Sequence, residues 1–318
     1  MRIAAMAAGA VGGYFGARMA AAGHDVFFIA RGANLAAIKN NGLKIESVHG
    51  DVHLPKPNVT DDPAKVGAVD IVLFAVKLWD TEKAAELTRP LLGPDSRLIT
   101  LQNGVDSVER IAPILGADRT IGGAAYIATV IASPGVIKQT SQFAKMRFGR
   151  ADKKPDAKLQ AFVDAGKAAK IDVGISADIE RERWEKFAFL TAMAGSTAAL
   201  RSPIGPIVAD AELRGFFRKL MEEAFAIAKA KGVALDPAYI EERMAFVTSK
   251  VEPGMKDSMA HDLERGNRLE LDWLAGKVRE LGRALKIPTP ASDTVYTDRK
   301  STRLNSSHSD RSRMPSSA

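Results

Sequence analysis

The sequence predicts an α/β fold, a doubly wound parallel sheet with an antiparallel extension, followed by an all-helical C-terminal domain. Two observations predict the sheet: continuous apolar runs, typical of strands buried on both faces, and helical segments that alternate with them. A third predicts the second domain, because helical spacing of apolar residues prevails after residue 176. At 318 residues the chain is also longer than one typical core, so two domains are expected.

The first predicted elements surround a glycine-rich turn. "RIAAMA" (2–7) predicts a buried strand, residues 12–22 have helical spacing, and "DVFFIA" (25–30) predicts a second strand. Gly9 and Gly12 stand between the first strand and the helix. Glycines at such a turn let the helix N-terminus approach both the strand and a pyrophosphate, as in Rossmann-type dinucleotide-binding domains.

The turn departs from the usual Gly-x-Gly-x-x-Gly pattern at its first position, which is alanine. An alanine there costs about 1–2 kcal/mol if the bend is left-handed, and little if the backbone angle is ordinary. We therefore expect a nucleotide to bind. The turn residues expected to contact it are Ala7, Ala8, Gly9, Ala10, Val11 and Gly12.

The end of the second predicted strand indicates which nucleotide binds. An NAD site usually has an acidic residue there for the ribose hydroxyls, but this strand ends Ala30-Arg31-Gly32. The guanidinium of Arg31 suits a 2′-phosphate, so the sequence favours NADP (NADPH) as cofactor. The alternative is an ordinary exposed arginine without a ligand.

The rest of the first half continues the sheet. "VDIVLFAVK" (69–77) and "RLITLQNG" (97–104) predict buried strands separated by a helix. A hairpin is expected over 43–56, with its turn at His49-Gly50-Asp51. Residues 120–149 predict antiparallel strands that extend the sheet about the turn Ser133-Pro134-Gly135.

The second half predicts a helical domain. We assign residues 1–177 to an NADP-binding Rossmann-like domain and 178–297 to a helical domain with substrate-binding and catalytic residues. The predicted helices lie within 178–200, 210–232, 237–250 and 267–286.

The last residues, 298–318, differ from the rest. They are rich in Ser and Arg and have no hydrophobic period, which is typical of a disordered tail. "DRKSTRLNSSH" is also what a common sequencing-adapter string encodes, and "SRMPSSA" fits the far end of that adapter. We expect 298–318 to be an adapter-derived, non-native tail, and the natural chain to continue differently after Thr297.

Composition narrows the possible functions. The absence of Cys excludes disulfides and thiol catalysis, and five scattered His make a metal site unexpected. The tail has five Lys/Arg and two Asp, so it contributes +3 of the net charge of +7. The sequence also has no basic stripe with interleaved aromatic residues. We therefore expect no nucleic-acid partner. No apolar run spans a membrane and no signal peptide is recognisable, so a cytoplasmic protein without a membrane partner is expected.

Several stretches resemble the ketopantoate reductase family (2-dehydropantoate 2-reductases). They are "GAVGGYFGARMAAAGHDVFFIARG", "FAVKLWDT", "LQNGVD", "SPGVI", "RWEKFAFL" and "DSMAHDLERGNRLELDWLAG", in the expected order over residues 1–297. The glycine turn is common to many dehydrogenases, but its combination with the later Lys and Ser…Glu is far more specific. The resemblance implies a dinucleotide-binding domain joined to a helical domain, with the active site in the cleft.

The resemblance also implies a reaction, hydride transfer from NADPH to a 2-oxo acid. In the family, 2-dehydropantoate (ketopantoate) becomes pantoate on the way to pantothenate and coenzyme A. Lys186 and Glu270 match the catalytic residues, and Ser258, Asn103 and Lys77 match substrate contacts. Lys77, Asn103 and Glu270 also match cofactor contacts. The chemistry fits, because a lysine ammonium can stabilise and protonate the alkoxide that forms when hydride reaches a ketone.

Each of these residues also has a structural interpretation. Lys186 can pair with Glu182 on a solvated helix face, and Glu270 can be an ordinary exposed helix charge. Ser258 can cap a helix that begins at Met259. Positions 258 and 270 lie about 120° apart on one straight helix, so both reach one site only if the helix breaks, as Gly266-Asn267 suggests.

The chain also departs from the family pattern. Two Asn follow the catalytic Lys by four and eight residues in the biosynthetic enzymes, whereas Leu190 and Ala194 stand here, which predicts a more apolar pocket wall. Asp80 replaces a residue that is often Gln. The alternatives are therefore a paralogous NADPH-dependent reductase of a bulkier 2-oxo acid, or a non-catalytic NADP-binding module. A monomer and a homodimer are both compatible with the sequence.

Overall fold

The structure is a computed structural model that describes residues 1–309, with side chains up to residue 300. The chain divides into two compact units, Met1–Arg183 and a second that begins at Trp184. This division falls inside helix α6 (Ile179–Ala199), whereas the sequence places the boundary just before that helix.

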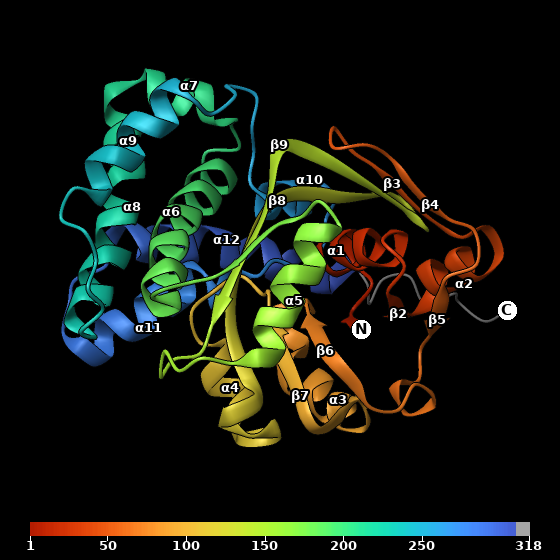
Figure 1. Cartoon of the computed structure of the whole chain (residues 1–318). Coiled ribbons are helices and arrows are strands. Elements are labelled where there is room, and N and C mark those ends of the chain that lie inside the picture. The colour runs from red at the N-terminus through yellow and green to blue at the C-terminus, as the bar shows by residue number, and fades with distance from the viewer. Residues whose placement is uncertain (310–318) are drawn as a thin grey trace, which may run out of the picture. The chain divides into compact units, whose positions relative to one another are not determined.

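The first unit is built on one sheet, as predicted. In the part of the chain that the structure describes, the strand order is β4-β3-β9-β8-β7-β6-β1-β2-β5, and β10 pairs with β9. Strands β8, β7, β6, β1, β2 and β5 are parallel, whereas β8–β9 and β3–β4 are antiparallel, which confirms the predicted extension and hairpin (Figure 1). The strands are β1 (Arg2–Met6), β2 (Asp25–Ile29), β3 (Leu43–Glu46), β4 (Val52–Leu54), β5 (Asn58–Thr60), β6 (Val69–Phe74), β7 (Leu92–Thr100), β8 (Thr120–Ser133), β9 (Val136–Gly149) and β10 (Asp172–Ile175).

Helices cover both faces of this sheet because its central strands are apolar on both faces. Ile3 and Ala5 of β1 join the core that contains side chains of α1 and α5. Their neighbours Ala4 and Met6 join the opposite core, with side chains of α3 and α4. This alternation follows from the two-residue period of a strand. The helices of this unit are α1 (Ala10–Ala21), α2 (Gly32–Asn41), α3 (Thr81–Thr88), α4 (Ser107–Leu115) and α5 (Ala157–Ala168).

The second unit is helical, as predicted. A close approach of its helices is visible at Gly195 of α6, where a Cβ would lie 3.1 Å from the Leu220 side chain and 3.4 Å from that of Val295. The remaining helices are α7 (Ile204–Ala209), α8 (Ala211–Ala230), α9 (Tyr239–Ser249), α10 (Ser258–Glu264), α11 (Ala275–Leu285) and α12 (Pro290–Ser309). Helix α12 runs through residues 297 and 298, and the expected tail beyond residue 309 lies outside the described residues.

The predicted helix within 267–286 is confirmed only in its C-terminal part. The segment 267–286 forms a short 3-10 turn, Leu271–Trp273, and α11 begins only at Ala275. The ring of Tyr296 on α12 lies against the start of α11, only 2.9 Å from where a Cβ of Gly276 would stand. Tertiary packing therefore overrides the helical spacing here.

Candidate functional site

The glycine turn between β1 and α1 combines one close contact with one open position. A Cβ at Gly12 would lie 2.3 Å from the Ala7 carbonyl oxygen, so only glycine lets α1 approach the end of β1. A Cβ at Gly9, the N-cap of α1, would meet nothing within 4 Å. The first turn of α1 carries no acidic residue, and the first N–H groups of a helix have no intrahelical acceptor. These features fit a pyrophosphate above the helix N-terminus.

The alanine at the first glycine position is compatible with this turn. Ala7 does not belong to the non-glycine residues with positive φ in the described chain, so no left-handed strain arises there. Ala8 differs from its neighbours, because its N–H already donates to the Ile29 carbonyl at 2.7 Å and its side chain is buried. The expected backbone donors are therefore those that follow Ala8.

A shallow surface hollow lies beside this turn and the end of β2. Arg31, the predicted reader of the 2′-phosphate, lines it, and its Nη2 lies 3.4 Å from Oδ2 of Asp80. Asp80, a departure from the family pattern, is thus the ionic partner of Arg31. Ala7, Asp61 and Lys83 line the same hollow.

The loops that carry Lys77 and Asn103 are tied together by a buried amide. Gln102, 6% exposed, donates from Nε2 to the Val76 carbonyl at 3.0 Å and to Oγ1 of Thr81 at 2.9 Å. These two partners flank the segment with Lys77, whereas Gln102 immediately precedes Asn103. Sequence reasoning missed Gln102; its place inside "LQNG", at the end of a buried strand, was the available signal.

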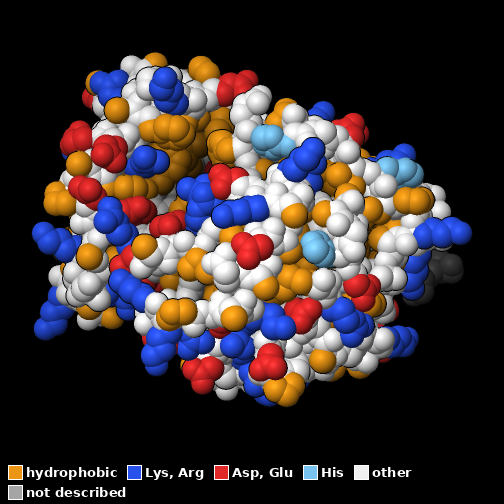
Figure 2. Space-filling model, in the orientation of Figure 1, with side chains coloured by type: hydrophobic (Ala, Val, Ile, Leu, Met, Phe, Trp, Pro, Cys, Tyr) orange, Lys and Arg blue, Asp and Glu red, His pale blue; other side chains and the backbone are white. Residues whose placement is uncertain are grey.

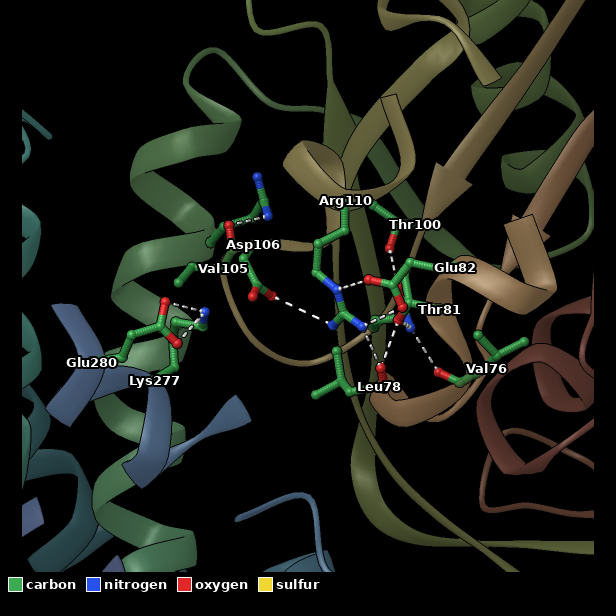
Figure 3. A network of polar contacts seen from close by, with 12 residues as sticks. Val76, Leu78, Thr81, Glu82, Thr100, Val105, Asp106, Arg110, Lys277 and Glu280 are labelled. Carbon is green, nitrogen blue, oxygen red and sulfur yellow. Dashed lines mark hydrogen bonds and ion pairs between the residues drawn. The ribbon is translucent and has the colours of Figure 1, made fainter. Parts of the chain in front are cut away.

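An arginine reinforces the same two loops. Arg110 of α4 donates to Glu82 at 2.6 and 2.8 Å and to the Leu78 carbonyl at 2.8 Å (Figure 3). The hydrogen bond from Arg110 lowers the pKa of Glu82. A second contact joins Arg110 to Asp106 at 3.9 Å. Charge pairing therefore holds the loop after β6 against the start of α4.

In the second unit, Lys186 lies between hydrophobic neighbours on α6. It is partly buried, and Trp184 and Phe187 beside it are each 1% exposed. Burial lowers the pKa of Lys186 to about 8, although the carboxylates of Asp257 and Glu270 act in the opposite direction. Glu182, the partner considered from the sequence, instead accepts a hydrogen bond from Ser176 at 2.7 Å.

Two carboxylates of the second unit therefore act on Lys186, and one of them was not predicted. Asp257 is the N-cap of α10 and accepts from the Met259 N–H at 2.9 Å, so the interpretation of Ser258 as the cap is wrong. Ser258 is the exposed first residue of the helix, and its Oγ donates to Asp257 at 3.3 Å. Burial raises the pKa of Asp257. An aspartate directly before a helix is a frequent N-cap, and this position was the available signal for Asp257.

The break expected between Ser258 and Glu270 is confirmed. Helix α10 ends at Glu264, and Gly266 has a φ of +69°. Glu270 immediately precedes the following 3-10 turn and is 8% exposed, so it is not an ordinary exposed helix charge. The carboxylates on both sides of the break reach Lys186 electrostatically.

The two apolar departures after Lys186 differ from each other. Leu190 is partly exposed, whereas Ala194 is 0% exposed and belongs to the core. Of this pair, only Leu190 presents surface that a ligand can touch.

On the face shown in Figure 2, Lys and Arg side chains are interspersed with Asp and Glu. Among the described residues, no group of three or more His, Asp or Glu is arranged to hold a metal ion. Within that same part of the chain, every helix is too short or too polar to cross a membrane.

Comparison with known families identifies the chain. The family model described as "Ketopantoate reductase PanE/ApbA" matches residues 3–153, and its C-terminal counterpart matches residues 178–299. The chain belongs to the ketopantoate reductase family. It is therefore an oxidoreductase, and the predicted resemblance and fold class are confirmed.

Individual relatives cover nearly the whole chain. A 2-dehydropantoate 2-reductase of Mesorhizobium japonicum is 32% identical and covers 93% of this chain and 95% of its own length. An uncharacterised oxidoreductase of Bacillus subtilis, YkpB, is 30% identical over 94% of this chain and 97% of its own. A ketopantoate reductase family structure from Ralstonia eutropha has 31% identity and a TM-score of 0.86, covering 97% of this chain and 99% of that one. A D-mandelate dehydrogenase with NADH shares the fold alone, at 18% identity and a TM-score of 0.88 over 96% of this chain and 99% of that one.

Proposed function

We propose that this protein reduces 2-dehydropantoate to pantoate with NADPH, and that Lys186 supplies the proton. The observation that carries the proposal is a lysine with a pKa of about 8 beside Asp257 and Glu270, in a chain that belongs to the ketopantoate reductase family. A general acid works best when its pKa lies near the working pH.

The first unit supplies the residues that would hold the dinucleotide. The turn at Gly9 leaves space for a phosphate, and Arg31 offers a guanidinium to the 2′-phosphate. Lys77 and Asn103 follow β6 and β7, at the carboxyl edge of the parallel sheet where such folds bind ligands. The bound cofactor would deliver a hydride to the ketone carbon of the substrate.

The second unit supplies the acid–base residues. The Lys186 ammonium stabilises the negative charge that develops on the ketone oxygen and then transfers its proton to it, giving the alcohol. Glu270 keeps this ammonium charged and accepts a hydrogen bond from the substrate hydroxyl. Ser258, exposed at the start of α10, offers a hydroxyl to the substrate carboxylate.

A second candidate substrate is a bulkier, more apolar 2-oxo acid. Leu190 supports it, because this partly exposed side chain stands one helical turn after Lys186, where an amide would bond a substrate hydroxyl. An apolar side chain there gives no hydrogen bond and accommodates bulk instead.

Steady-state NADPH oxidation distinguishes the two substrates. The proposal predicts the highest kcat/KM with 2-dehydropantoate, compared with phenylpyruvate and 2-oxoisovalerate. A higher kcat/KM with phenylpyruvate would favour the second candidate. In that case Leu190→Asn should shift the preference towards 2-dehydropantoate, whereas Leu285→Asn, an exposed leucine of α11, should leave it unchanged.

A further inference from the structure

The ion pair between Arg31 and Asp80 places a carboxylate where a dinucleotide site has to distinguish its cofactors. The Arg31 side chain is 62% exposed and the Asp80 side chain 34%, so both are accessible from the hollow that they line. Asp61 and Lys83 add one further charge of each sign.

Asp80 stands at a position where an aspartate side chain ordinarily caps a helix. It is the N-cap of α3, and aspartate there usually accepts hydrogen bonds from the first N–H groups of the helix. The Asp80 side chain makes no such capping bond, and its Oδ2 is directed to Arg31 instead. The carboxylate therefore faces the hollow and does not cap the helix.

We propose that Asp80 is a specificity-determining residue that weakens the preference of this site for NADPH over NADH. The proposal rests on the dinucleotide site of the proposed function. The Asp80 carboxylate accepts hydrogen bonds from the ribose hydroxyls of NADH. It thereby replaces the acidic residue that is absent from the end of β2, at Ala30-Arg31-Gly32. The same carboxylate repels the 2′-phosphate of NADPH and competes with it for Arg31.

The expected size of the effect follows from electrostatics at an exposed site. A 2′-phosphate carries more than one negative charge near neutral pH. Like charges about 4 Å apart in water repel by about 1 kcal/mol per unit charge pair, which is roughly a fivefold to tenfold change in affinity. Arg31 and Lys83 still favour the phosphate, so NADPH remains bound while NADH also binds measurably.

Dissociation constants of both nucleotides test the proposal without turnover. NADPH and NADH are titrated by nucleotide fluorescence into the full-length wild type, Asp80→Asn and Asp61→Asn. We expect Asp80→Asn to bind NADPH about tenfold more tightly and NADH more weakly, because the repulsion and the ribose acceptor are both removed. Asp61→Asn removes the same charge from the same hollow and is expected to change the ratio of the two constants less than Asp80→Asn does. Asp80→Ser should act in the same direction as Asp80→Asn, and urea unfolding confirms that each variant is folded.

The outcomes separate this proposal from the proposed function. If Asp80→Asn and Asp80→Ser leave the ratio of the two constants unchanged in a protein that binds both nucleotides, the specificity role is wrong while the reductase assignment stands. The specificity role is also wrong if Asp61→Asn changes the ratio equally, because charge alone then accounts for the effect. If neither nucleotide binds the folded wild type, the dinucleotide site fails, and both proposals fail with it.

Discussion

The side-chain amide of Gln102 donates a hydrogen bond to the Val76 carbonyl at 3.0 Å. This bond joins the end of β7 to the segment after β6, and thereby the loop of Asn103 to the loop of Lys77. Two residues that the family pattern assigns to ligand binding thus lie on loops that one buried side-chain amide holds together.

Replacing this amide should weaken both the fold and nucleotide binding. Gln102→Leu leaves the Val76 carbonyl and the Thr81 hydroxyl without their buried donor, at a cost of about 1–3 kcal/mol in the free energy of unfolding. We also expect a raised dissociation constant for NADPH, because Lys77 and Asn103 lose a fixed position. Urea unfolding and fluorescence titration measure the two effects. Gln160→Leu on the exposed face of α5 is the control, and an equal loss there would contradict the assignment.

A substitution at the open position of Gly9 should weaken nucleotide binding without lowering the stability of the fold. Gly9→Ala adds a methyl group into space that no protein atom occupies within 4 Å, so the protein should fold normally. Nucleotide affinity should nevertheless fall by tenfold or more, about 1.4 kcal/mol, because the methyl group occupies the space of the phosphate. Gly215→Ala, in open space within α8, should stabilise the fold by about 0.5–1 kcal/mol and leave affinity unchanged. Unaltered NADPH affinity in Gly9→Ala would place the phosphates elsewhere.

The pKa of Lys186 predicts opposite pH profiles for the two reaction directions. Reduction needs the protonated ammonium, so its kcat should fall as the pH rises through about 8. Oxidation of pantoate needs the neutral amine and should become faster over the same interval. Initial rates in both directions from pH 6 to 10 give the profiles. A reduction rate that stays constant to pH 10 would exclude Lys186 as the acid.

Asp257 should set the midpoint of that profile. Its carboxylate raises the pKa of Lys186, so Asp257→Asn should move the midpoint below that of the wild type. Asparagine caps helices about as well as aspartate, which keeps α10 folded. Asp210→Asn changes another N-cap aspartate of the same unit and should leave the midpoint in place. If the midpoint rises or stays in Asp257→Asn, the proposed electrostatic coupling is wrong.

The sequence predicted the sheet well because its strands are rich in apolar residues and are separated by turn residues. The hairpin over 43–56 and the antiparallel pair about Gly135 both formed. Helices α2 and α4 were not foreseen, since α2 has little amphipathic pattern and α4 contains Pro113. The boundary of α11 was missed because packing against a distant segment does not appear in local spacing.

The candidate site was predictable only in part. Lys186 and Glu270 were predicted from their motif positions. Their electrostatic coupling also needs a helix break, which Gly266-Asn267 suggested. Asp257 acts on the lysine through space, and Asp80 reaches Arg31 from another element. Partners that meet only through the fold leave no periodic signal in one sequence.

The most direct test of the account is the rate of NADPH oxidation with 2-dehydropantoate at pH 7, for the wild type and for Lys186→Met. The account predicts turnover by the wild type and a loss of about 10²–10⁴-fold in kcat in the variant, with the dissociation constant of NADPH unchanged. A variant that keeps the wild-type rate would contradict the role of Lys186. A folded wild type that binds NADPH but turns over no 2-dehydropantoate would contradict the assigned substrate.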